Sequence, residues 1–166
     1  MKLSKKTLAI LKNFSTINQS IVIKPGNVVE TISDVKDMFA KVEIEESFDS
    51  TVAIYDLNEF LGVISLFEDP DFEFGEKSVV ISEDNQKQQY HYADPSIITQ
   101  APESGLKLPS VEVEGTLTRD VLVKIAKAAA VNSATHVSFT KGDVVVQHKA
   151  APNSNNYTVN GVMTEG

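Results

Sequence analysis

The chain has 166 residues, no cysteine and 42% apolar residues, which suits one large domain or slightly more. Its 8 glycines and 6 prolines exclude collagen-like and low-complexity chains, and the lack of thiols excludes disulfide scaffolds and cysteine-ligated zinc. No run approaches the roughly 20 apolar residues of a membrane span, so we expect a soluble, cytoplasmic protein without a signal peptide.

The net charge of −8 is distributed unevenly. Residues 1–17 contain four lysines and no acid, and residues 118–131 contain three cations and one acid, so the other residues together carry −14. Both positive segments have helical patterns. The net charge alone argues against a general nucleic-acid binder, but its distribution predicts an acidic body that bears basic helices.

The first predicted element is an amphipathic helix from about Ser4, its N-cap, to Phe14. Its apolar stripe lies on one side and its lysines lie on the other. Three strands are predicted next, at residues 20–24, 27–32 and 38–46, and the turn pair Pro25-Gly26 joins the first two.

The same pattern then recurs twice. A strand at 51–55 precedes a helix capped by Asp56, and strands follow near 71–75, 77–82 and 87–92. The third copy has a strand at 111–116, a helix from 118 to about 131, and strands at 135–140, 143–148 and 156–162. Helix starts near 4, 56 and 118 lie 52 and 62 residues apart, which suits an internally duplicated α+β domain better than a solenoid.

The spacing of these units predicts the domain boundaries. We expect an N-terminal domain at 1–95, a proline-punctuated linker at 96–110, and the first half of a second domain at 111–166. One complete domain is thus followed by about half of another. Because a half-domain exposes a sheet edge and part of its core, we expect another copy of the chain to cover it.

No motif indicates catalysis, a metal site or a cofactor. The acidic run of Glu68, Asp69, Asp71 and Glu73 straddles a proline and is typical of a solvated turn. The three histidines lie far apart and outside any nucleophile or zinc motif, and no glycine-rich phosphate loop is present. An enzyme is therefore the least favoured functional class.

A resemblance to a known family rests on four stretches. They are KLS (2–4), ILKNFSTINQSIVIKPG (10–26), TVAIYDLNEFLGVISLF (51–67) and YADPS (92–96). Together they resemble the sliding clamps of T4-type bacteriophages, which are processivity factors of the replicative DNA polymerase. The similarity is dense over residues 1–100, weaker from 111 to 148 and faint at the end.

The resemblance implies the DNA-clamp fold, in a homotrimeric ring of two-domain subunits. The last quarter of the usual subunit would then be absent from this chain. The implied partners are duplex DNA, bound without sequence specificity, the replicative DNA polymerase, the clamp loader and further copies of the chain. No cofactor and no membrane are implied.

The DNA-binding candidates follow from the charge pattern and from the resemblance together. A ring that slides along DNA needs attraction to phosphates without readout of bases, and lysines suit that task as mobile point charges. In the family the helices line the inner wall of the ring. The resemblance thus implies these phosphate-facing residues: Lys2, Lys5, Lys12, Lys124 and Lys127. The alternative is that the lysines form a solvated face.

Two further sites are expected. The linker's apolar side chains could border a groove for a short hydrophobic peptide of a partner, or could merely fasten the linker to the core; they are Ile97, Ile98, Leu106 and Leu108.

In clamps, subunits join by pairing one strand from each of two neighbours. The matching segments here are 88–92 and 157–162, with Gln88, Tyr90, Tyr92, Tyr157 and Val159 as candidate contacts.

One alternative from another functional class remains open. An α+β interaction or scaffold domain could use its basic helix to contact a membrane or an acidic protein. A membrane role has little support, because the first helix has no Trp and only one Phe.

Overall fold

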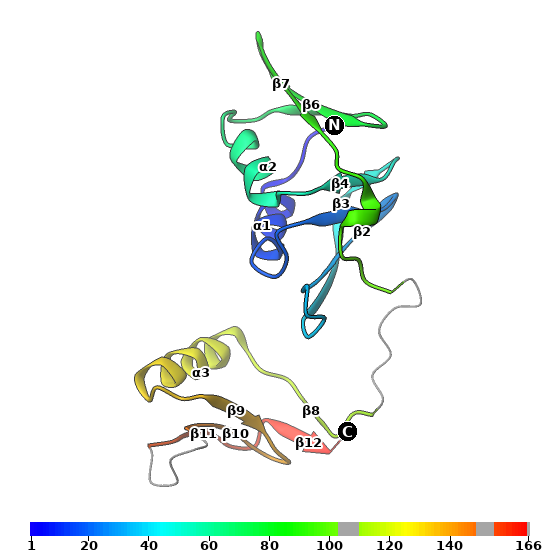
Figure 1. The fold of residues 1–166 in the computed structure, drawn as a ribbon. Coiled ribbons are helices and arrows are strands. Elements are labelled where there is room, and N and C mark those ends of the chain that lie inside the picture. Colours follow the sequence, from blue (N-terminus) through cyan, green and yellow to red (C-terminus); the bar gives the residue numbers. More distant parts are fainter. Residues whose placement is uncertain (103–109, 149–154, 166) are drawn as a thin grey trace. The chain divides into compact units, whose positions relative to one another are not determined.

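The computed structural model describes residues 1–102, 110–148 and 155–165, and the chain divides into two compact units, Met1–Leu106 and Lys107–Gly166 (Figure 1). Within these residues, no helix has both the length and the apolar character needed to cross a membrane.

Unit 1 contains two copies of a helix followed by three strands, and a short strand precedes the second helix. In chain order the elements are α1 (Lys5–Phe14), β1 (Ile21–Ile23), β2 (Gly26–Ile32), β3 (Phe39–Phe48), β4 (Val52–Ile54), α2 (Leu57–Ile64), β5 (Asp71–Phe74), β6 (Ser78–Glu83) and β7 (Gln86–His91). A short 3-10 helix, Pro95–Ile97, follows.

Unit 2 repeats the pattern once more. Its elements are β8 (Val113–Gly115), α3 (Arg119–Val131), β9 (His136–Phe139), β10 (Val144–Gln147), β11 (Tyr157–Val159) and β12 (Met163–Glu165). Every strand pair in the described chain is antiparallel, so the predicted α+β class with repeated units is confirmed. The strand expected at 156–162 is present but shorter: β11 ends at Val159, because Gly161 turns the chain with a φ of 71°, and β12 is a further strand that the sequence analysis did not predict.

The three helices begin in the same way. The Ser4 hydroxyl accepts a hydrogen bond from the Thr7 N–H at 3.2 Å, and the Asp56 carboxylate accepts one from the Glu59 N–H at 2.9 Å. Thr118 caps α3 likewise. Each cap satisfies backbone donors that the helix leaves free, which is why the helix starts were readable from sequence.

Backbone pairing joins the two halves of unit 1 reciprocally. β1, which follows α1, pairs with β4, which precedes α2. Conversely, Met1 precedes α1 and exchanges two hydrogen bonds, of 2.6 and 2.7 Å, with Phe72 of β5, which follows α2. The turn pair Pro25-Gly26 links β1 to β2, with Gly26 as the first residue of β2, but these strands belong to different sheets, because β1 pairs with β4 and β2 with β3.

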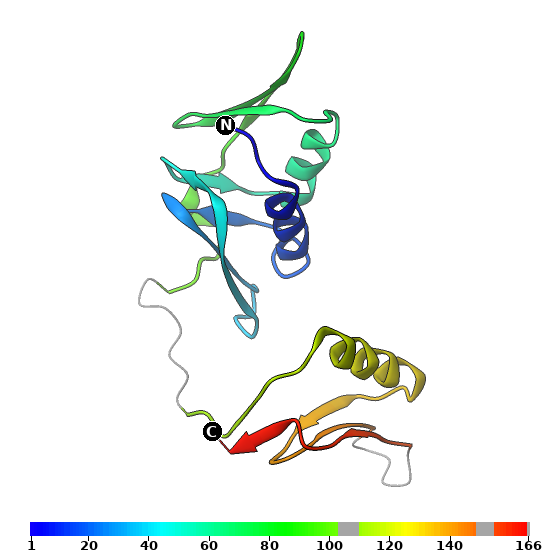
Figure 2. The ribbon, with the colours of Figure 1, turned by 180° about the vertical axis from the view of Figure 1, so that it is seen from behind.

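One core fills unit 1. α1 and α2 both pack on it, and Figures 1 and 2 show them side by side on one side of the unit. Its largest fully buried side chains include Leu11 of α1, Phe60 of α2 and Phe72 of β5. A smaller cluster in unit 2 joins Ile125 of α3 to β10.

Glu46 on β3 anchors the start of α1. Its carboxylate accepts hydrogen bonds from the Thr7 hydroxyl at 2.6 Å and from the Ser4 N–H. Partial burial by itself would raise the pKa of Glu46, but the hydrogen bonds from Thr7 and Ser4 outweigh it, so the pKa lies below its ordinary value.

Glu46→Gln should lower the free energy of unfolding by about 1–2 kcal/mol near pH 7, because an amide cannot accept both hydrogen bonds. Since the folded pKa is depressed, this stabilisation is present above the unfolded pKa and is lost as the pH falls through the folded pKa. Denaturant titrations across this range measure the difference, with exposed Glu45→Gln as the control. A deficit that persists at low pH would instead indicate lost packing.

Candidate nucleic-acid interface

The outward faces of α1 and α2 form one surface of unit 1. Lys5, Lys6 and Lys12 are exposed on α1, whereas Thr7, Leu11 and Phe14 are buried beneath it. Because residues four and three positions apart share a helix face, Lys5 and Lys12 lie on the same side of α1. No described residue forms an ion pair with either lysine.

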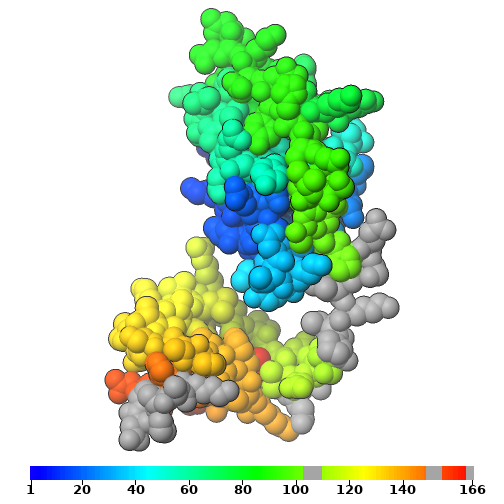
Figure 3. All heavy atoms as spheres, in the orientation of Figure 1, coloured from blue at the N-terminus to red at the C-terminus, as the bar shows by residue number. Residues whose placement is uncertain are grey.

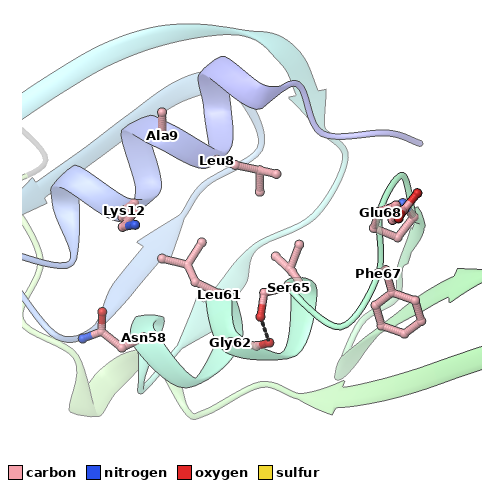
Figure 4. A pocket seen from close by; sticks show the side chains of 11 residues that line it. Leu8, Ala9, Lys12, Asn58, Leu61, Gly62, Ser65, Phe67 and Glu68 are labelled. Atoms are coloured by element: carbon pink, nitrogen blue, oxygen red, sulfur yellow. Dashed lines mark hydrogen bonds between the residues drawn. The ribbon is translucent and has the colours of Figure 1, made fainter.

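A hollow of about 500 Å³ separates the outer parts of α1 and α2. Leu8, Ala9 and Lys12 line it from α1, and Leu61 and Ser65 are among those that line it from α2 (Figure 4). Its walls are mainly apolar and Lys12 stands at its rim. The sequence analysis missed this hollow, because it arises from the separation of two helices and no motif marks that.

The exposed side of α2 carries no cation. Asn58, Glu59, Gly62 and Ser65 are exposed there, and all of them except Glu59 line the hollow opposite Lys12. The Asp56 carboxylate at the start of α2 accepts hydrogen bonds from the Glu59 N–H and from the Gln19 side chain, and both lower its pKa. The surface is therefore positive along α1 and slightly acidic along α2.

Lys2 differs from the other lysine candidates. Its ammonium group forms a salt bridge with the Asp69 carboxylate and donates a hydrogen bond to the Asp69 carbonyl oxygen at 2.9 Å. The hydrogen bond to the Asp69 side chain is the main cause that raises the pKa of Lys2. Part of its positive field is thus cancelled by the acidic turn.

That acidic turn is held by hydrogen bonds. The Glu83 carboxylate accepts the N–H groups of Glu68 and Asp69 at 3.0 and 2.6 Å. Among the described residues, no group of three or more His, Asp or Glu side chains is placed to hold a metal ion.

The other predicted cations lie in unit 2. Arg119, Lys124 and Lys127 are exposed on α3. The structure therefore brings Lys5 and Lys12 together on one helix and Lys124 and Lys127 together on another.

The expected peptide groove at the linker is partly wrong. Ile98 is buried, 5% exposed, against Val22 and Ala53, so it fastens the linker to unit 1 and cannot be an exposed groove wall. Ile97 is 63% exposed and lines a shallow hollow of about 160 Å³ with Tyr55. Leu106 and Leu108 lie outside the described residues.

The candidate subunit-contact strands both lie at sheet edges. In the described chain, β7 is an outer strand of the sheet β5-β6-β7, and β11 is an outer strand of β11-β10-β9. Gln88 is exposed, but Tyr90 packs edge-on against Phe60 with ring centres 5.1 Å apart. The other candidate side chains, Tyr92, Tyr157 and Val159, also pack partly against their own units. These strands therefore offer a neighbouring chain mainly the backbone N–H and C=O groups of their outer edges.

Comparison with known proteins identifies relatives. Residues 2–100 match the family of DNA polymerase processivity factors. The chain is 36% identical over 135 residues to the sliding clamp of Vibrio phage KVP40, and this alignment covers 78% of this chain and 60% of that protein. It is 39% identical over 112 residues to the sliding clamp of Enterobacteria phage T4, and this alignment covers 66% of this chain and 48% of that protein.

A third similarity is to the sliding clamp of Escherichia phage RB69, with 45% identity over 69 residues, 42% of this chain and 30% of that protein. The chain thus spans 60% or less of the length of these three relatives. The resemblance inferred from the four sequence stretches is confirmed.

Asp69→Asn should lower the pKa of Lys2 towards its ordinary value, because it removes the charged hydrogen-bond acceptor. The pair's contribution to stability is present below the unfolded pKa of lysine and is lost as the pH rises through the raised folded pKa. NMR titration of the Lys2 side chain measures the shift. Asp71→Asn is the matched control, since Asp71 acts only at longer range; an equal effect of both variants would contradict the assigned cause.

Proposed function

The chain belongs to the family of DNA polymerase processivity factors, and we propose on that premise that it acts as a sliding clamp. It encircles duplex DNA and tethers the replicative DNA polymerase for processive synthesis, without catalysis of its own, in the cytoplasm of a bacterial host. The observation that carries this proposal is the basic face of α1 on an acidic protein of net charge −8.

The α1 lysines suit contact with phosphates. Lys5 and Lys12 are exposed and lie opposite the buried stripe of α1, so their ammonium groups can reach a polyanion while the helix stays packed. The side of α2 continues the same surface without a cation and with one exposed carboxylate, Glu59, so α1 supplies the attraction in unit 1. Lys124 and Lys127 supply the same chemistry from α3, and Lys2 contributes less because Asp69 pairs with it.

This arrangement favours attraction without sequence specificity. Flexible lysines on a helix surface bind phosphates at many registers, whereas base readout would hold a ring at one site. We infer that the clamp loader opens and closes such a ring, which contains three copies of the complete subunit.

Lys5→Glu combined with Lys12→Glu should weaken duplex binding at low salt at least about tenfold and should reduce the salt dependence by about two released ions, because two phosphate contacts are lost. Fluorescence anisotropy of a labelled duplex measures binding, and primer extension with polymerase and loader measures processivity. Lys36→Glu with Lys77→Glu is the matched control, since these exposed lysines lie outside the helices. Equal losses from both double variants would refute the proposed DNA face.

We further propose that subunits join through the open edges of β7 and β11. Just after β7, the Tyr92 N–H donates to the Lys77 carbonyl oxygen at 2.9 Å, so it points towards β6 and away from the open edge. Because N–H groups alternate in direction along a strand, the N–H groups of Gln89 and His91 face the open edge. A strand such as β11 from a neighbouring copy can pair there and extend the sheet.

Gln89→Pro should weaken head-to-tail association, because it removes a backbone donor from the open edge and leaves the inward backbone hydrogen bonds of β7 intact. Gln89→Ala is the matched control, since it removes only the side-chain hydrogen bond to the Ser78 hydroxyl. Sedimentation velocity over a range of concentrations measures the assembly, and circular dichroism verifies the fold. Thr158→Pro tests the partner strand, because Val144 of β10 faces Val159, which leaves the N–H of Thr158 at the open edge. Assemblies of unchanged mass in both variants would exclude this contact while leaving the clamp proposal standing.

We propose that a partner's peptide contacts only the start of the linker. The exposed Ile97 beside Tyr55 can receive an apolar side chain, whereas Ile98 is unavailable.

A further inference from the structure

The turn between β11 and β12 contains a chemically reactive pair of residues. Asn160 is followed there by Gly161, and no other asparagine of the sequence is followed by a glycine. Both residues are exposed. An asparagine before a glycine is prone to lose its side-chain amide, because glycine has no Cβ to crowd the ring that the reaction forms.

The reaction is a deamidation within the chain. The Gly161 backbone nitrogen loses its proton and attacks the side-chain carbonyl carbon of Asn160, and the new nitrogen–carbon bond closes a succinimide ring. The bond from that carbon to the side-chain nitrogen breaks, and this nitrogen takes up a proton and leaves as ammonia. Water then opens the ring at either carbonyl carbon, which gives an aspartate or an isoaspartate.

The structure shows a hydrogen bond on the attacking nitrogen. The Gly161 N–H donates to the Asp143 carboxylate, with 3.3 Å between the nitrogen and Oδ1. Asp143 ends the turn between β9 and β10, where its backbone exchanges hydrogen bonds of 2.9 and 3.2 Å with the backbone of Thr140. These bonds do not use the Asp143 side chain, which reaches across to Gly161 instead.

Backbone groups hold the next residues of the same turn. The Gly142 carbonyl oxygen accepts a hydrogen bond from the Val162 N–H at 2.9 Å, and the Gly142 N–H donates to the Met163 carbonyl oxygen at 3.1 Å. Residues 140–143 and 160–163 therefore form one turn junction. Within it, a side chain holds Gly161, whereas backbone groups hold Val162 and Met163.

Packing does not block the reaction at Gly161. A side-chain carbon at this position would meet no other atom within 4 Å, so the space around it is open. Figure 3 shows the orange residues near position 140 at the outer surface of unit 2, where water reaches them. The hydrogen bond to Asp143 is thus the local restraint on the Gly161 nitrogen.

We propose that Asn160 is a site of spontaneous deamidation and that the Asp143 carboxylate restrains it. A hydrogen bond to a carboxylate keeps the proton on the Gly161 nitrogen and holds this nitrogen in the turn. The negative charge of Asp143 also opposes the amide anion that must form before the attack. Both effects slow the first step of the reaction.

The opposite role for Asp143 is that of a general base, which would take the Gly161 proton and accelerate the reaction. Carboxylates are far weaker bases than backbone amide anions, so this role is not favoured. The two roles predict opposite effects when the carboxylate is removed.

Deamidation changes the turn junction. Either product places a carboxylate one residue before the N–H that Asp143 binds, and the two like charges repel. Isoaspartate also adds one atom to the main chain between β11 and β12, which pair with different strands, β10 and β8. We expect this product to release the Val162 N–H from Gly142. The inference concerns unit 2 alone and does not depend on the clamp proposal.

The rate is measured on the folded chain aged in mildly alkaline buffer, by peptide mass spectrometry. Asp143→Ala should accelerate the conversion of Asn160 at least about fivefold, because the restraining hydrogen bond is lost. Glu112→Ala, which removes another exposed carboxylate of unit 2, is the matched control and should leave the rate unchanged. Asn85, exposed in the turn between β6 and β7 and followed by Gln86, is the internal reference.

Two outcomes of this measurement would overturn the proposal. An unchanged or lower rate in Asp143→Ala would exclude the restraint. Conversion of Asn160 that is no faster than that of Asn85 in the same variant would exclude the site.

Hydrogen exchange separates the role of Asp143 from a loss of structure. In Asp143→Ala, the Gly161 amide should exchange faster, whereas the Val162 amide should keep its protection through Gly142. Equal loss at both amides would show that the variant opens the junction and would contradict the assigned role. The isoaspartyl form, separated by ion exchange, should lose protection at Val162; full protection there would exclude the proposed effect on the junction.

Discussion

The structure depends on one constraint: a helix followed by three antiparallel strands cannot bury its own apolar surface. In unit 1, the constraint is met by a second half of the same kind, and the two halves meet through a shared core and through exchanged strand pairs. The result is a single core in which Leu11, Ile54 and Phe60 are almost completely buried. Figure 4 shows that α1 and α2 run antiparallel above it.

The placement of charge is a consequence of this packing. Once α1 and α2 lie side by side over one core, their outer faces become one surface, on which α1 supplies the lysines and α2 supplies no cation. A processivity factor needs such a surface, because attraction to phosphates must act without fixing the protein at one base sequence. The fold thus turns the uneven charge of the sequence into a basic face.

Not every predicted site residue has the surroundings that its local sequence suggests. Lys5 and Lys12 lie where a helical wheel places them, because side-chain direction on a helix is a local property. Lys2 pairs with Asp69, 67 residues away in sequence, and Ile98 is buried against β1 and β4. Neither contact leaves a local signal, since each depends on how distant strands and turns come together. The hollow beside Lys12 escaped sequence analysis for the same reason.

The sequence by itself determined the α+β class, the helix starts and the repeated units, because caps at Ser4, Asp56 and Thr118 and the spacing of apolar residues act over only a few residues. The tertiary structure decided the strand partners: β1 joins β4 across two halves, and β12 joins β8 around α3. These outcomes depend on which backbone edges and apolar faces meet in space, and short-range patterns carry no information about such meetings.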